Sequence, residues 1–139
     1  MDIQFIHKKL SEMVGIYIHE FTFNNLRIDA IIIDIPHRWI RGFEIKMNKA
    51  DFNRDFKWQL YTEFCSSLSI VCPSGIIEPK EVNHPFGLLW IHEASTANQW
   101  TTYEWKKRPK KFNRRDSLAW TWTYLKVLEK ELPRLACEK

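Results

Sequence analysis

Two acidic residues and one lysine form the most informative group of chemical side chains in this sequence. Asp29 lies in the apolar run LRIDAIIIDI, and Glu44 and Lys46 lie in the next extended run, WIRGFEIKM. The residues between the two runs, 36–38, predict a tight turn and therefore an antiparallel hairpin. In such a hairpin Asp29 falls opposite the Glu44–Lys46 stretch, within about 5 Å or one diagonal further.

Two carboxylates and an ammonium on one sheet face predict metal-dependent phosphodiester chemistry. Glu44 and Lys46 are two residues apart, so they share a face at a separation of roughly 6–7 Å. Neighbouring carboxylates raise each other's pKa unless a cation compensates, and Mg²⁺ binds one or two carboxylates together with water and phosphate. A lysine beside the ion can hold or deprotonate the attacking water. The alternative is a solvated Glu44–Lys46 ion pair, because E-x-K is a common tripeptide.

The elements around this hairpin predict one α/β domain over residues 1–139. A helix is expected where apolar residues recur at helical spacing, and a strand where they alternate or run together. The expected helices are 3–13, 50–65 and 118–132, and the expected strands are 16–23, 26–35, 39–47, 68–72, 87–91 and 101–105. This order predicts a mixed central sheet flanked by helices, with a C-terminal helix.

Composition excludes several other classes of protein. The chain has 139 residues, 45% of them hydrophobic and 27% charged, which is typical of a globular domain and not of a disordered chain. The formal charge of +4 permits a polyanionic partner. The three cysteines and five histidines show no metal spacing, and the cysteines predict no disulfide framework. No apolar window is long enough for a membrane span and no signal peptide is evident, so a cytoplasmic location is expected.

The Asp-then-Glu-x-Lys arrangement resembles the PD-(D/E)XK nuclease superfamily, with Ile28 in place of the proline. A closer resemblance is to the MmcB-type DNA repair proteins. It extends from Arg27 to Pro73, about a third of the chain, through RIDAIII and FEIKMNKADFNRDFKWQLYTEFCSSLSIVCP. The later KKRPKK run is a weaker point of similarity.

The resemblance implies a restriction-endonuclease-like αβββαβ core that binds Mg²⁺ or Mn²⁺. Asp29 and Glu44 would be metal ligands, the backbone carbonyl of Ile45 would be a third ligand, and Lys46 would be the catalytic lysine. Members of the superfamily often add an acidic residue from the first helix or first strand. Glu12 and Glu20 are the candidates, and Glu20 is preferred because H-E-F matches an acidic position in the MmcB-type pattern.

The helix that follows the motif provides two further auxiliary candidates. Related nucleases place a lysine or glutamine from this helix near the active site, which Lys57 or Gln59 would do here. The alternative, a solvated polar helix face, is about equally favoured by the sequence.

A basic segment near residue 110 is the candidate nucleic-acid-binding region. It is expected to follow the last strand, and its seven cations are Lys106, Lys107, Arg108, Lys110, Lys111, Arg114 and Arg115. Such runs commonly contact phosphates, and neighbouring aromatic side chains can stack on exposed bases. The alternative is an ordinary solvated loop.

Together these features predict a Mg²⁺- or Mn²⁺-dependent deoxyribonuclease, more an endonuclease than an exonuclease. It would act in DNA repair, recombination or the processing of phage or mobile-element DNA. The alternative is a catalytically silent nuclease-fold module that binds DNA or a protein partner. RNA as the substrate, and assembly as a homodimer or in a larger repair or phage complex, stay open at this level.

Overall fold

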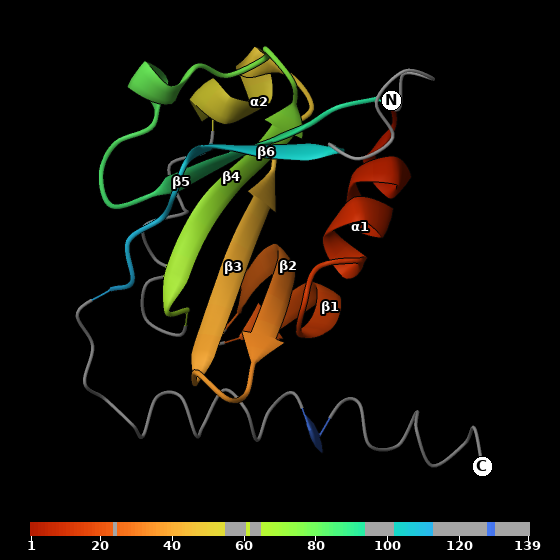
Figure 1. Cartoon of the computed structure of the whole chain (residues 1–139), viewed down its shortest axis with the longest axis vertical. Helices are drawn as coiled ribbons and strands as arrows, with labels where there is room; N and C mark the ends of the chain where they lie inside the picture. Colours follow the sequence, from red (N-terminus) through yellow and green to blue (C-terminus); the bar gives the residue numbers. More distant parts are fainter. Residues whose placement is uncertain (24, 55–60, 62–64, 94–101, 113–127, 130–139) are drawn as a thin grey trace.

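The computed structural model describes residues 1–23, 25–54, 61, 65–93, 102–112 and 128–129, and its main feature is one six-stranded sheet (Figure 1). The strands lie side by side in the order in which they occur in the chain. The elements are α1 (Ile3–Ser11), β1 (Ile16–Phe23), β2 (Leu26–Asp34), β3 (Trp39–Ile45), α2 (Lys49–Arg54), β4 (Ser67–Pro73), the 3₁₀ helix η2 (Pro79–Glu81), β5 (Gly87–Ile91) and β6 (Tyr103–Lys107).

The sheet is mixed, which confirms the predicted α/β class. Strands β1, β2 and β3 are antiparallel, β3, β4 and β5 are parallel, and β6 is antiparallel to β5. The β2–β3 hairpin closes at the pair Asp34–Trp39, as the turn at 36–38 predicts. The Arg38 N–H donates to the Ile35 carbonyl, and the Asp34 carboxylate accepts from the His37 N–H, so local bonds hold the turn.

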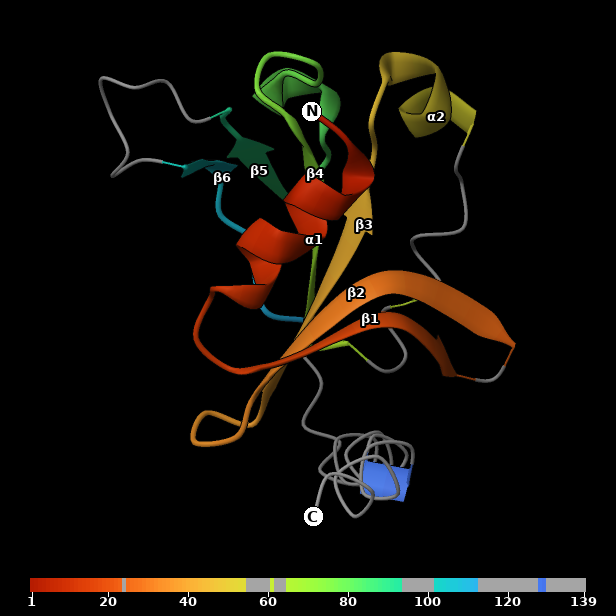
Figure 2. The ribbon, with the colours of Figure 1, turned by 90° about the vertical axis from the view of Figure 1, so that its right-hand side faces the viewer.

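Helix α1 covers one face of the sheet, which we call the α1 face (Figures 1 and 2). Asp2 caps the helix by accepting the Phe5 N–H at 2.9 Å. Ile6 and Leu10, one turn apart, are fully buried. They belong to one cluster with inward side chains of four neighbouring strands, which include Ala30, Ile32, Phe43, Val71 and Leu89. The helix therefore docks through the apolar spacing that predicts it.

The opposite face, which we call the far face, carries the larger apolar cluster. Its members include Ile31, Ile33, Ile40, Leu68 and Ile70, with Phe52 of α2 packed against them. Tyr61 is buried in this cluster and donates its hydroxyl to the Arg27 carbonyl at 2.6 Å, so it completes the core. Cys65 and Cys72 are buried free thiols in this cluster. Burial raises the pKa of the Cys72 thiol to about 11.

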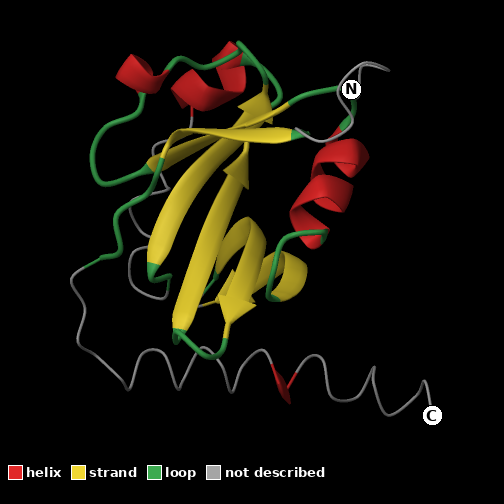
Figure 3. Ribbon diagram, viewed as in Figure 1, coloured by secondary structure: helices red, strands yellow, loops and turns green. Residues whose placement is uncertain are grey.

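The structure differs from the sequence prediction at the end of the sheet. We expected the basic segment to follow the last strand, but β6 continues through Lys107, so Lys106 and Lys107 are strand residues. Figure 3 distinguishes the strands of the sheet from the loops and helices. The pairing of β5 with β6 contains a register shift between Leu88 and Leu89, and Leu88 pairs with Lys107. An irregularity of this kind leaves no clear mark on the hydrophobic pattern of an edge strand.

Two predicted helices extend beyond the described residues. Of the helix predicted at 50–65, the structure describes Lys49–Arg54 as α2. Of the predicted C-terminal helix, only Leu128 and Glu129 are described, and both are helical. In the part of the chain that the structure describes, no helix combines the length and the apolar character that crossing a bilayer requires.

Alanine at Gly42 tests the packing of the far face. The added Cβ would lie 2.7 Å from Cys65 Sγ and 2.8 Å from Ile28 Cδ1, which is too close for either contact to persist. We expect this overpacking to lower the free energy of unfolding by about 1–3 kcal/mol in urea denaturation. In a double-mutant cycle with Cys65→Ala the cost should fall, because the nearest atom is gone. A Gly42→Ala variant as stable as the wild type would contradict the packing.

Candidate active site

Asp29 and Glu44 face each other where β2 separates from β3. The pairing of β2 with β3 ends at Ala30–Phe43, whereas β2 stays paired with β1 as far as Leu26. Figure 2 shows β1 and β2 curving away from β3 together. The next register position would place Asp29 opposite Glu44, so the two acidic residues lie at the point of divergence. The strand pattern of the sequence predicts this proximity.

Side chains replace the missing backbone bonds at this point. The Ile45 N–H donates to Oδ2 of Asp29 at 2.8 Å, and the Asp29 N–H donates to Oε1 of Glu44 at 3.3 Å. We call this pair of bonds the carboxylate bridge. Buried backbone N–H groups must find acceptors, and the two carboxylates supply them where the neighbouring strand does not. The carboxyl groups are thereby fixed relative to the sheet.

Lys46 lies directly after β3 and is anchored by β4. Its N–H donates to the Val71 carbonyl at 2.8 Å, and its Nζ lies 3.9 Å from Oε2 of Glu44. The exposed fractions are 4% for Glu44 and 7% for Lys46. A solvated ion pair on a half-exposed sheet, the alternative from the sequence, therefore does not describe this pair. Charged residues are almost never buried to this extent without paired charges.

The negative charge of the bridge affects titratable groups on both sides of the sheet. Burial raises the pKa of the Cys65 thiol, and the charge of Glu44 raises it further. On the other side, burial raises the pKa of the Tyr17 hydroxyl, and the charge of Asp29 adds to this. Among the described residues, this site brings together two carboxylates and one ammonium, which gives an excess of negative charge. Such a site favours a bound cation.

The comparisons with known proteins give one solved structure with the same fold. It is SPO1766, described as a protein of unknown function from Silicibacter pomeroyi, and it is 24% identical to this chain. The likeness covers 86% of this chain and 76% of that one, with a TM-score of 0.67. No family model and no curated protein matches the sequence. The likeness therefore supports the α/β fold and leaves function to be argued from the site.

The auxiliary acid candidates are directed to other partners. Glu20 is the β1 residue opposite Asp29, between the pairs His19–Ala30 and Phe21–Ile28, but its backbone has a positive φ of 55°. Its carboxylate is exposed and lies 2.6 Å from the Arg27 guanidinium. Glu12 lies at the end of α1 and pairs with Lys9 at 3.6 Å. Neither acid takes part in the carboxylate bridge. Lys57 and Gln59, the other auxiliary candidates, lie outside the described residues.

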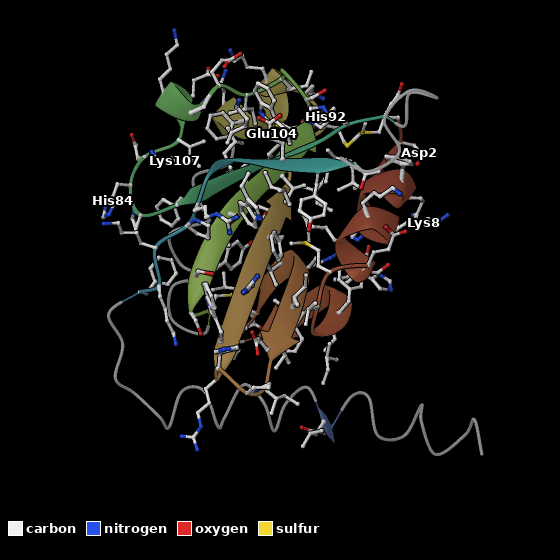
Figure 4. The ribbon with its side chains drawn as sticks, in the orientation of Figure 1. Asp2, Lys8, His84, His92, Glu104 and Lys107 are labelled. Carbon is white, nitrogen blue, oxygen red and sulfur yellow. The ribbon has the colours of Figure 1, made fainter. Side chains whose placement is uncertain are left out.

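The basic segment is divided between β6 and the stretch after it. Lys106 lies 3.1 Å from Glu104 and over the Trp90 ring, and Lys107 donates to the Val82 carbonyl. Figure 4 labels Glu104 and Lys107 along β6. After the strand, Arg108 lies over Trp105 and Lys111 over Trp39, and Lys110 is exposed. Arg114 and Arg115 are outside the described residues.

Three aromatic rings near Asp29 form a cluster that no sequence motif predicts. His7 of α1 shares a hydrogen bond with the Tyr17 hydroxyl, and His19 lies beside both. The charge of Asp29 acts on His7 and on Tyr17. Period-two spacing could have placed Tyr17 and His19 on one strand face, but only the docking of α1 brings His7 to them.

The donor set at the bridge fits a hard divalent cation. Asp29 and Glu44 provide carboxylate oxygens from two adjacent strands, and Mg²⁺ prefers oxygen ligands. Within the described residues, no group of three or more His, Cys, Asp or Glu side chains is placed to hold a metal ion. A bound ion would therefore complete its shell with main-chain oxygen, water and substrate phosphate. This is the usual pattern for Mg²⁺.

Substitution of Asp29 separates its structural role from its charge. The Asp29→Asn variant would keep a side-chain oxygen that accepts the Ile45 N–H, whereas Asp29→Ala would leave that donor without its partner. We expect Asp29→Ala to be less stable than Asp29→Asn by about 1–3 kcal/mol, measured by urea denaturation. Equal stability of the two variants would show that the carboxylate bridge does not hold β2 against β3.

Proposed function

We propose that this protein is a metal-dependent nuclease of the PD-(D/E)XK type that hydrolyses DNA phosphodiester bonds. The observation that carries the proposal is the carboxylate bridge with the ammonium of Lys46 beside it. Asp29 lies on β2, whereas Glu44 and Lys46 lie at the end of β3. The three side chains meet where β2 diverges from β3. A purely structural ion pair requires only two of them.

The order of elements supports a restriction-endonuclease-like core. The chain runs α1, β1, β2, β3, α2, β4, which is the αβββαβ order that the resemblance implies. The antiparallel β1–β2–β3 unit followed by the parallel β4 places the motif at the centre of the sheet. Residues on central strands are held more rigidly than residues on loops, and hydrolysis requires such precise positioning.

The chain's own residues have distinct roles in the proposed reaction. Asp29, Glu44 and the carbonyl of Ile45 would hold Mg²⁺ or Mn²⁺, which stabilises charge on the phosphate and lowers the pKa of bound water. Glu44 keeps the Lys46 ammonium within 3.9 Å of its carboxylate. From there Lys46 donates hydrogen bonds to the attacking water or to the phosphate oxygens. Its charge offsets the negative charge that develops in the transition state.

Positive charge elsewhere on the surface supports a polyanionic substrate. The formal charge of the whole chain is +4, although the bridge itself carries excess negative charge. The cations after β6, Arg108, Lys110 and Lys111, are exposed and available to contact phosphates. Because the bridge repels a phosphate until a metal ion is bound, cations elsewhere on the surface must provide the initial attraction.

Cleavage assays with single-site variants test the proposal. Wild-type protein with Mg²⁺ or Mn²⁺ should cut single-stranded, duplex or branched DNA. Glu44→Ala and Lys46→Ala should each lower the rate by about 10²–10⁴-fold, because each removes a group that acts at the reacting phosphate. The matched control is the ion pair Lys49–Glu81, which joins α2 to η2 at 2.8 Å. Alanine at either of these positions should leave cleavage near the wild-type rate.

The deep burial of Glu44 and Lys46 is the observation that favours the alternative function. Side chains that are more than nine-tenths buried are poorly accessible to substrate, as expected for a silent module that binds DNA or a protein. Wild-type protein that binds DNA but never cuts it under these conditions would support the proposal of a silent binding module and contradict the proposal of a nuclease. The same set of substrates made of RNA decides which nucleic acid is preferred.

The salt dependence of DNA affinity tests the docking role of the basic segment. Each neutralised phosphate contributes about 0.9 to the slope of log affinity against log salt. We expect combined alanine substitution of Arg108, Lys110 and Lys111 to flatten this slope by about two to three units. Substitution of Lys49 and Lys80, which lie on α2 and η2, is the control and should change the slope by less than one unit. Unchanged affinity and slope in the triple variant would place DNA on another surface.

A further inference from the structure

Arg41 of β3 is a half-buried arginine that has no acceptor for its hydrogen-bond donors among the described residues. Its guanidinium lies over the Trp39 ring, with Cζ 4.1 Å from the ring centroid, and its Nε is shielded from solvent. Asp34, the register partner of Trp39, directs its carboxylate to His37 instead. Buried donors without acceptors are rare in native structures, and each requires an explanation. Arg41 therefore has the free donors that an anion-binding residue needs.

The indole ring beside Arg41 is fixed in place and carries a second cation. The Trp39 Nε1–H donates to Oγ of Ser67 at 2.9 Å, and Ser67 is fully buried on β4. Lys111, from the stretch after β6, lies over the same ring, with its Nζ 5.9 Å from the centroid. Cation–π attraction holds both charges close to one indole despite their mutual repulsion. Two cations held in this way favour an anion beside them.

Arg41 lies on the α1 face, whereas Glu44 of the carboxylate bridge lies on the far face. Ile32, the register partner of Arg41, belongs to the α1-face cluster, and so does Phe43, two residues further along β3. Successive strand residues project from opposite faces, so Glu44 is on the other side of the sheet. Arg41 is therefore separate from the proposed reaction centre, although only about 10 Å of strand lies between the two residues.

A row of aromatic rings connects Arg41 to a third cation. The Phe43 ring, next to Arg41 on the same face, lies 6.4 Å from the Trp105 ring of β6, and Arg108 lies over Trp105 at 5.8 Å. Within the described part of the chain, none of the three cations forms an ion pair with a carboxylate. We call this set the cation–indole surface, and its members are Trp39, Arg41, Trp105, Arg108 and Lys111.

We propose that the cation–indole surface binds the phosphate backbone of nucleic acid, with Arg41 in direct contact with a phosphate. The inference rests on the nucleic-acid partner of the proposed function and not on cleavage. A guanidinium with free donors can give two parallel hydrogen bonds to one phosphate. A nucleic acid offers one charge per nucleotide along its backbone, which suits several fixed cations better than a flexible acidic peptide does. Phosphate contacts carry no sequence information, so this binding is independent of base sequence.

Fluorescence anisotropy of labelled DNA, measured in EDTA over a range of salt concentrations, tests the surface without any need for cleavage. Arg41→Met keeps an apolar stem over Trp39 but removes the charge. It should weaken binding by roughly 10- to 100-fold at low salt and flatten the slope of log affinity against log salt by about one unit. Arg41→Lys keeps the charge but loses the planar fork, so it should keep the slope and bind severalfold more weakly. Lys80→Ala, which removes an exposed cation of η2, is the control and should bind within about twofold of the wild type.

Competition with poly-glutamate decides between nucleic acid and an acidic peptide. Poly-glutamate should displace the labelled DNA far less effectively than unlabelled DNA does, and equal displacement would overturn the assignment to nucleic acid. The proposal is also overturned if Arg41→Met keeps wild-type affinity and salt slope. Failure of the nuclease proposal gives a different result. Binding that depends on Arg41, in a protein that never cuts DNA with Mg²⁺ or Mn²⁺, supports the surface and contradicts the nuclease.

Discussion

The divergence of β2 from β3 is the constraint on which the site depends. Strand β3 remains paired with β4 through Ile45, while the part of β2 that precedes Ala30 follows β1 away from β3. The N–H groups of Asp29 and Ile45 then need acceptors, and the carboxylates of Glu44 and Asp29 provide them. The same bonds that complete the sheet therefore hold two acids at fixed positions. Structure and proposed chemistry use the same atoms.

This arrangement carries an energetic cost that the fold alone does not require. Glu44 and Lys46 are buried. Asp29 adds a second negative charge, and its carboxylate accepts the N–H of Ile45, which lies between them. Burial of a charge is unfavourable unless it is paired, and neutral amide side chains would accept the same N–H groups without that cost. Natural sequences break such rules mainly at functional sites. The cost is thus an argument for a role beyond stability, and a bound cation would offset it.

Much of this geometry could be predicted from the sequence, because a strand pattern repeats every two residues. Asp29 and Glu44 fall opposite each other once the turn at 36–38 is placed, and the burial of the Ile-rich β2 follows from its composition. Other features depend on tertiary contacts. The positive φ of Glu20 and its pairing with Arg27 leave no mark on the strand pattern. His7 approaches Tyr17 only because α1 packs across the sheet. Strand β6 ends at Lys107, two residues beyond the predicted end, and its pairing with β5 contains a register shift that the sequence pattern does not show.

Binding of Mn²⁺ in the absence of DNA is the most direct test of the central claim that the carboxylate bridge is a cation site. In a titration followed by the electron paramagnetic resonance signal of free Mn²⁺, the wild-type chain should bind about one ion. Asp29→Asn and Glu44→Gln keep the shape of the bridge but remove its charge, so each should weaken binding at least tenfold, while Glu81→Gln, on η2, should not. Equal binding by the wild type and by the Asp29→Asn/Glu44→Gln double variant would contradict the account.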